Sequence, residues 1–283
     1  MNGNTHHAVT RVAIVTGASK GIGRDIALRL ADDGLDVTIN SRNAAELEVV
    51  AEEIRAKGRK ALAFVGDVSD EEVVQSMVEK TVEVLGRLDV MVANAGTAVV
   101  SRVVDMSLKD WNYCMDSNLA SVMLCYKYAA RQMIKQGEGG RILGASSILG
   151  KKGGPEVSAY VATKFAIRGL TQCLAIELAP HKITANTYAP GVILTPLTNI
   201  DVLDKQYGGT HGAFTKHVSN PSHVPVNIPL RQFFNPMKVC GIAPDGPHSS
   251  GDTVASLVSY LAKPEAYFIT GQTIVMDGGV VMS

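Results

Sequence analysis

The chain has 283 residues, 46% of them hydrophobic and 19% charged, which is enough for a sizeable core and argues against overall disorder. Its 27 basic and 27 acidic residues balance, so no net charge favours binding to nucleic acid or to an anionic membrane. Because the chain shows neither the apolar run of a signal peptide nor about 20 consecutive apolar residues, we expect a soluble protein of the cytoplasm without a membrane partner.

Short apolar runs alternate with longer amphipathic stretches along most of the chain. The β-branched run at 12–16 is typical of a buried parallel strand, and the spacing of apolar residues at 21–33 indicates a helix. In chain order the same patterns predict strands at 12–16, 36–40, 60–65, 88–92, 140–146, 182–187 and 273–276, and helices at 21–33, 44–57, 69–85, 118–136, 158–179 and 252–262. Ser69 and Glu72 fit a capping box at the start of the third helix. Such alternation predicts a doubly wound parallel sheet with helices on both faces, a three-layer α/β/α fold.

Residues 198–251 break this alternation. They include six of the eleven prolines and four of the seven histidines, and they show no sustained periodicity. Segments this long without regular structure are often functional lids, and one that follows a strand should emerge at the carboxyl edge of the sheet, where open α/β folds bind ligands. We therefore predict a flexible tail over 1–10 and a single domain over 11–283 with a substrate lid at 198–251. Part of that segment, 234–250, is equally well explained as a surface excursion with no role.

The cysteines and histidines do not form a metal-binding pattern. The four cysteines include no CxxC pair, which favours reduced, buried thiols (Cys114, Cys125, Cys173 and Cys240). The histidines of the 198–251 segment do not share a helix face, and no carboxylate cluster accompanies them (His211, His217, His223 and His248). We therefore predict no metal site.

The first predicted strand runs into the sequence TGASKGIG at 16–23. Glycines at a tight turn between a strand and a helix let the backbone approach a pyrophosphate, which then lies at the positive amino end of the helix. The spacing is G-x-x-x-G-x-G rather than the standard G-x-G-x-x-G. The sequence predicts a dinucleotide site here, with contacts from Gly17, Ser19, Lys20, Gly21, Ile22 and Gly23.

The end of the second predicted strand should meet the adenosine ribose of the dinucleotide. An acidic residue there would bind the 2′-hydroxyl of NAD, whereas an arginine would accept the 2′-phosphate of NADP. Residues 40–43 read NSRN, with no carboxylate and one guanidinium, a group suited to gripping phosphate. We therefore predict NADP(H) as the cofactor; the alternative for Arg42 is a solvated loop charge. The predicted contacts are Ser41, Arg42 and Asn43 at the ribose, Asp67 and Val68 at the adenine, and Asn94, Ala95 and Gly96 at the sheet edge.

Tyr160 and Lys164 lie four residues apart on a predicted helix, so their side chains project from the same face. A phenol titrates near about pH 10, and a nearby ammonium lowers its pKa by favouring the phenolate. Such a tyrosine can exchange a proton with a substrate oxygen near neutral pH. Ser147, at the carboxyl end of a predicted strand, could donate to the same oxygen, and Asn118 could hold a water molecule against Lys164.

Together and in this order, these motifs resemble the short-chain dehydrogenase/reductase family, and the resemblance covers nearly the whole chain, from Val12 to Gly279. It implies a Rossmann-type sheet of seven strands in one domain. It also implies a catalytic tetrad, in which Tyr160 is the acid/base and Ser147 steadies the substrate oxygen. Lys164 would bind the nicotinamide ribose and lower the pKa of Tyr160, and Asn118 would anchor a proton relay.

Two further segments match the family. The sequence PGVILT at 190–195 is similar to its nicotinamide-binding turn, which implies contacts from Pro190 and Gly191, from the Ile193 amide and from the Thr195 hydroxyl. The ending at 269–279 resembles members that are mostly homotetramers, which implies the same assembly here.

Within the family, 159–172 and 177–180 are similar to diacetyl/acetoin reductases, although those usually prefer NAD and carry an acid where this chain has Ser41. Ile148, beside the catalytic Ser147, is expected to form an apolar wall of the substrate pocket. The hypothesis is an NADPH-dependent carbonyl reductase for a ketone or secondary alcohol of the diacetyl/acetoin kind. The alternatives are a 3-oxoacyl-[acyl-carrier-protein] reductase and, in another class, a non-catalytic NADP(H)-sensing protein.

Overall fold

The computed structural model describes residues 9–193, 195 and 249–282. Within them, seven strands form one parallel sheet in the order β3-β2-β1-β4-β5-β6-β7. The strands are β1 (Val12–Thr16), β2 (Asp36–Ser41), β3 (Ala61–Val65), β4 (Val90–Ala93), β5 (Gly140–Ala145), β6 (Ile183–Pro190) and β7 (Thr273–Met276). The chain runs outward from β1 to β3 and then returns to β4 on the other side of β1. This reversal confirms the predicted doubly wound Rossmann sheet.

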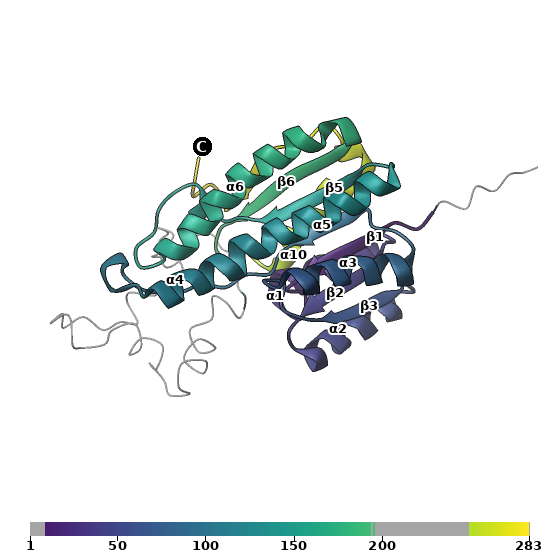
Figure 1. The fold of residues 1–283 in the computed structure, drawn as a ribbon, viewed down its shortest axis with the longest axis horizontal. Helices are drawn as coiled ribbons and strands as arrows, with labels where there is room; N and C mark the ends of the chain where they lie inside the picture. The colour runs from purple at the N-terminus through teal and green to yellow at the C-terminus, as the bar shows by residue number, and fades with distance from the viewer. Residues whose placement is uncertain (1–8, 194, 196–248, 283) are drawn as a thin grey trace, which may run out of the picture.

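Helices cover both faces of the sheet. Buried side chains of α1 (Gly21–Asp32), α2 (Ala44–Ala56) and α10 (Gly251–Ala262) form one apolar cluster with the sheet. Those of α3 (Glu71–Leu85), α5 (Ser121–Gln136) and α6 (Ser158–Leu178) form a second cluster, and Figure 1 shows these three helices side by side over one face.

Strand β1 contributes to both clusters, which explains its sequence. Ala13 and Val15 contact the first cluster, and Ile14 contacts the second. All residues of the strand are buried, because helices cover both sides of it. Such a strand is a continuous apolar run without polar alternation, as the sequence showed.

The predicted helix at 118–136 begins ten residues earlier in the structure. It starts as α4 (Leu108–Met115), passes through a π-helical turn at Asp116–Ala120 and continues as α5. A π-helical turn inserts a residue and shifts the helical periodicity, so the apolar pattern on one side does not continue on the other. Asn118 consequently lies within a long helix and not at its start.

The capping box predicted at Ser69 and Glu72 is wrong. Asp70 is the N-cap of α3, and its carboxylate accepts a hydrogen bond of 2.9 Å from the backbone amide of Glu72. Ser69 instead donates from its amide and its hydroxyl to Asp67 Oδ1, at 3.0 and 2.8 Å. An aspartate one position later offers a stronger acceptor, so the serine joins the preceding turn.

Strand β6 extends to Pro190, three residues beyond its predicted end, because Tyr188 and Pro190 pair with β7.

Most of the predicted lid and tail lies outside the described residues, as do Cys240 and the four histidines of the metal argument. Of the lid, only 249–251 are described: Ser249 forms a β-bridge with Ile193, and Gly251 begins α10.

Three cysteines lie in the described parts of the chain, each with its thiol outside any disulfide. Cys114 and Cys125 are buried, as predicted. Cys173 is exposed on α6, so the prediction of burial is wrong at this position. Among the described helices, none is both long and apolar enough to cross a membrane.

Candidate active site

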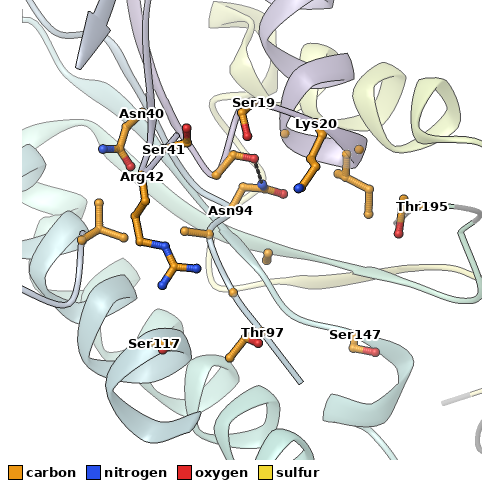
Figure 2. Close-up of a pocket in the computed structure, with 18 of the residues that line it drawn as sticks. Ser19, Lys20, Asn40, Ser41, Arg42, Asn94, Thr97, Ser117, Ser147 and Thr195 are labelled. Carbon is orange, nitrogen blue, oxygen red and sulfur yellow. Dashed lines mark hydrogen bonds between the residues drawn. The ribbon is translucent and has the colours of Figure 1, made fainter. Parts of the chain in front are cut away.

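A cavity of about 660 Å³ lies at the carboxyl ends of the strands, beside the point where the strand order reverses. Every residue that the sequence predicted to contact the cofactor lines this cavity: those of the glycine loop 17–23, of 41–43, 67–68, 94–96 and 190–195, and both Tyr160 and Lys164. Figure 2 shows Ser147 and Thr195 at the end of the cavity away from Arg42, so that the predicted catalytic and ribose-binding groups lie apart along it.

The glycine loop has the shape of a phosphate cradle. Gly17 has a φ of +66°, and a Cβ atom there would lie 2.9 Å from the Cα of Ala95. A Cβ atom on Gly23 would lie 2.3 Å from the carbonyl oxygen of Gly17. The N-cap of α1, Lys20, makes no side-chain capping hydrogen bond. The amino end of α1 therefore presents backbone amides and a close backbone approach, which fit a pyrophosphate.

A hydrogen-bond network fixes the floor of the cavity. The Thr16 hydroxyl oxygen accepts from the backbone amides of Asn94 and Ala95, each at 3.0 Å. The Asn94 side chain donates to the Thr16 carbonyl at 3.0 Å and accepts from the Tyr188 hydroxyl at 3.0 Å. Tyr188 is 1% exposed and lines the cavity, but it lies just beyond the strand predicted at 182–187, and nothing in the sequence pattern indicated this role.

Tyr188→Phe is expected to raise the KM for the dinucleotide several-fold, to leave kcat within about twofold, and to lower the free energy of unfolding by about 1 kcal/mol. The reason is that the Asn94 amide, which also contacts the glycine loop, loses a donor. Tyr126→Phe is the matched control, because Tyr126 is equally buried but its hydroxyl bonds Thr171 away from the cavity. Urea unfolding and steady-state kinetics test this; equal KM changes in both variants would contradict it.

Two ion pairs line the end of the cavity that is predicted to hold the adenosine. Arg42 Nη1 lies 3.6 Å from Asp67 Oδ2, and Lys20 Nζ lies 3.6 Å from Glu46 Oε2. Burial raises the pKa of Asp67, but hydrogen bonds from Ser69 and the nearby Arg42 outweigh this and hold the pKa below its usual value. Figure 2 shows Lys20 and Arg42 reaching toward the cavity from different loops.

The side chains of Ser41 and Asn43 serve the local backbone. The Asn43 side chain caps α2 by accepting from the Glu46 amide at 3.2 Å, and Ser41 Oγ accepts from the Asn43 amide at 3.2 Å. Sequence reasoning missed Glu46, because an acidic residue in the first turn of a helix is ordinary.

Tyr160 and Lys164 lie in the first two turns of α6. The Lys164 ammonium is 5.3 Å from the centre of the Tyr160 ring and donates to the Ala145 carbonyl at 2.7 Å. Lys164 is 3% exposed, and burial lowers its pKa to about 8. The α6 helix therefore holds a cation against the phenol, as the four-residue spacing predicted.

Asn118 and Ser147 approach this pair from other elements. Asn118 is fully buried behind the cavity, where its side chain accepts from the Thr97 amide at 2.7 Å and donates to the Thr97 carbonyl at 2.9 Å. A Cβ atom on Gly96 would lie 3.0 Å from Asn118 Oδ1 and 3.7 Å from Lys164 Nζ, so these groups converge. The water molecule between Asn118 and Lys164 stays a prediction.

Ser147 lines the cavity, and its hydroxyl oxygen accepts from the Leu149 amide at 3.1 Å. Ile148, predicted as a wall of the substrate pocket, is instead fully buried in a cluster with Val100, Val157 and Val192 and is not among the residues that line the cavity. Its backbone enters a short 3-10 turn after Ser147, which directs the next side chain inward. Tyr113 on α4 and Ser117 in the π-helical turn line the cavity in its place, and both were missed because neither element was predicted.

This arrangement can protonate, or remove a proton from, an oxygen bound beside Tyr160 and Ser147. The buried Lys164 favours the ionised phenol, and the glycine loop supplies a phosphate-binding helix end in the same cavity. A dinucleotide that spans the cavity would reach from the glycine loop to Tyr160 and Ser147.

Several known proteins resemble this chain over nearly its whole length. The family model described as short chain dehydrogenase matches residues 11–205. A short-chain dehydrogenase/reductase of Armillaria gallica is 45% identical over 96% of this chain and 96% of its own. A 3-oxoacyl-[acyl-carrier-protein] reductase of Staphylococcus aureus is 36% identical over 97% of this chain and 99% of its own. The crystal structure of an acetoin dehydrogenase from Salmonella typhimurium matches with a TM-score of 0.76 and 36% identity, covering 96% of each chain.

Proposed function

The chain belongs to the short-chain dehydrogenase/reductase family, and we propose that it is an NADPH-dependent carbonyl reductase that interconverts a ketone and a secondary alcohol. Membership makes it an oxidoreductase of carbonyl and alcohol groups with a nicotinamide dinucleotide as cofactor. The observation that carries the choice of NADP(H) is the pair Arg42 and Lys20, which line the same cavity as Tyr160 and Lys164 while β2 ends without a carboxylate.

The cofactor would lie along the whole cavity. The amides at the start of α1 would bind its pyrophosphate, and Arg42 and Lys20, with Ser41 and Asn43 beside them, would bind the 2′-phosphate. The adenine would meet Asp67 and Val68. The segment 190–195 would hold the nicotinamide through Pro190, Gly191, Ile193 and Thr195.

Bound NADPH would supply the hydride for the carbonyl carbon. The Tyr160 hydroxyl donates its proton to the carbonyl oxygen, and the Ser147 hydroxyl donates a hydrogen bond that holds this oxygen in place. Lys164, fixed by the Ala145 carbonyl, stabilises the phenolate that remains on Tyr160. Asn118 holds the Thr97 backbone behind Lys164 and would anchor the relay that returns a proton to Tyr160.

Small ketones of the diacetyl and acetoin kind are the proposed substrates. The acetoin dehydrogenase structure supports this class, since it matches nearly the whole chain. A 3-oxoacyl thioester is the second candidate, supported by the 36% identity to the Staphylococcus aureus reductase. A homotetramer is the proposed assembly, and the exposed Ile176 on α6 and Phe268 before β7 provide apolar surface for it. The cytoplasmic location stays a prediction from composition.

The cofactor proposal is tested by following the oxidation of NADPH and of NADH with diacetyl as the ketone. Wild-type protein should turn over faster with NADPH, and Arg42→Ala should raise the KM for NADPH about 10- to 100-fold with little change for NADH, because one charge-assisted phosphate contact is lost. Arg55→Ala, on the exposed side of α2, is the control and should change neither KM. A wild-type preference for NADH, or an equal effect of Arg42→Ala on both cofactors, would refute the assignment.

A further inference from the structure

Glu46 places a carboxylate among the cations of the adenosine end. It lies in the first turn of α2 and lines the cavity. Its Oε2 atom accepts a hydrogen bond from Ser19 Oγ at 3.1 Å and lies 3.6 Å from Lys20 Nζ. One carboxylate oxygen of Glu46 therefore contacts both the hydroxyl of Ser19 and the ammonium of Lys20, which belong to the glycine loop.

A phosphate oxygen would use the same two donors, since phosphates in proteins are held by hydroxyls, ammonium groups and guanidinium groups. The other cation of this end, Arg42, faces Asp67 at 3.6 Å. Each of the two cations therefore has a carboxylate partner, and the four charges sum to zero. A phosphate that enters must separate these pairs and come close to two negative side chains.

We propose that Glu46 is a specificity-determining residue, which competes with the 2′-phosphate of the cofactor for Ser19 and Lys20 and so limits the preference for NADP(H) over NAD(H). The proposal rests on the phosphate site proposed above. NAD(H), which has a hydroxyl in place of this phosphate, leaves the contacts of Glu46 with Ser19 and Lys20 in place. The discrimination between the two cofactors is thus the balance of two cations against their two carboxylate partners, and Glu46 is the partner that holds the donors of the glycine loop.

Glu46→Gln tests this with little structural change, because the amide oxygen can still accept from Ser19 and the capping bond uses the backbone amide of the residue. The dissociation constants of NADPH and NADH are measured by fluorescence titration of the full chain. NADPH should bind about three- to tenfold more tightly to the variant, from the loss of one like charge near the phosphate, with NADH unchanged within about twofold. The gain should shrink at high salt, since both side chains of the Lys20–Glu46 pair are partly exposed.

Glu48→Gln is the matched control. It removes the same charge from the same helix, but Glu48 pairs with Arg55 and is not among the residues that line the cavity; neither constant should change. Unchanged NADPH binding in Glu46→Gln, with a wild-type preference for NADPH, would overturn the role of Glu46 and leave the proposed cofactor standing. Weaker NADH binding in Glu46→Gln would also overturn it, because the carboxylate would then be a ribose ligand. A wild-type preference for NADH would instead refute the phosphate site itself.

Discussion

Tyr160→Phe is expected to lower kcat by about 10³-fold or more while the dissociation constant of NADPH stays within about twofold of the wild-type value. The variant keeps the ring, which packs beside Val161 against a buried apolar cluster, so the fold should be retained. It loses only the hydroxyl that would donate the proton to the carbonyl oxygen. Steady-state kinetics with diacetyl and a fluorescence titration with NADPH measure the two effects separately.

Tyr113→Phe is the appropriate control, because Tyr113 also lines the cavity but belongs to α4 and not to the Tyr160–Lys164 pair of α6. It should lower kcat less than about tenfold. Undiminished turnover of Tyr160→Phe would remove Tyr160 from the chemistry. Wild-type protein that binds NADPH and reduces no ketone would favour the non-catalytic NADP(H)-sensing alternative.

Lys164→Met should combine a loss of turnover with a gain in stability. Turnover should fall by about 10²-fold or more, because no ammonium remains to favour the phenolate of Tyr160. Burial lowers the pKa of Lys164 to about 8 in the folded chain, whereas an unfolded lysine titrates near about 10.4. Below about pH 8 both states carry the proton, and the folded state bears the full desolvation cost.

The unfolding free energy of the wild-type protein should therefore rise between about pH 8 and pH 10.4, where the unfolded chain binds more protons than the folded one. Methionine removes the buried charge but also the hydrogen bond to Ala145, so the net gain at pH 7 is about 1–3 kcal/mol. Urea unfolding without cofactor at pH 7 and pH 9.5 measures both quantities. Lys109→Met, at an exposed position of α4, should change neither. A Lys164→Met variant no more stable than wild type would contradict the desolvation argument.

The sequence was most informative where a function depends on neighbouring residues in the chain. The glycine loop and the Tyr160–Lys164 pair are local patterns, and each is positioned in the cavity as its spacing predicted. The central strands β1 and β4 were equally easy to predict, because burial on both faces makes each of them a short apolar run.

What the sequence did not reveal depends on contacts between distant elements. Tyr188 reaches Asn94 because β6 and β4 both flank β5 in the sheet, 94 residues apart in the chain. Glu46 meets Ser19 through the packing of α2 beside the glycine loop. Ile148 was misplaced for the opposite reason, since proximity to Ser147 in the chain does not fix which way a side chain points after a 3-10 turn.

The π-helical turn at Asp116–Ala120 sets the wall of the cavity by rotation. An α-helix turns by about 100° per residue, so an inserted residue offsets everything before it by that angle relative to everything after it. Tyr113 and Ser117 line the cavity, while the buried residues of α5 pack onto the sheet. One inserted residue thus lets the helix face the cavity before the turn and pack onto the sheet after it. Gaining or losing that single residue would rotate α4 by about 100° relative to α5, which would move Tyr113 along the cavity wall and, with it, the buried Cys114.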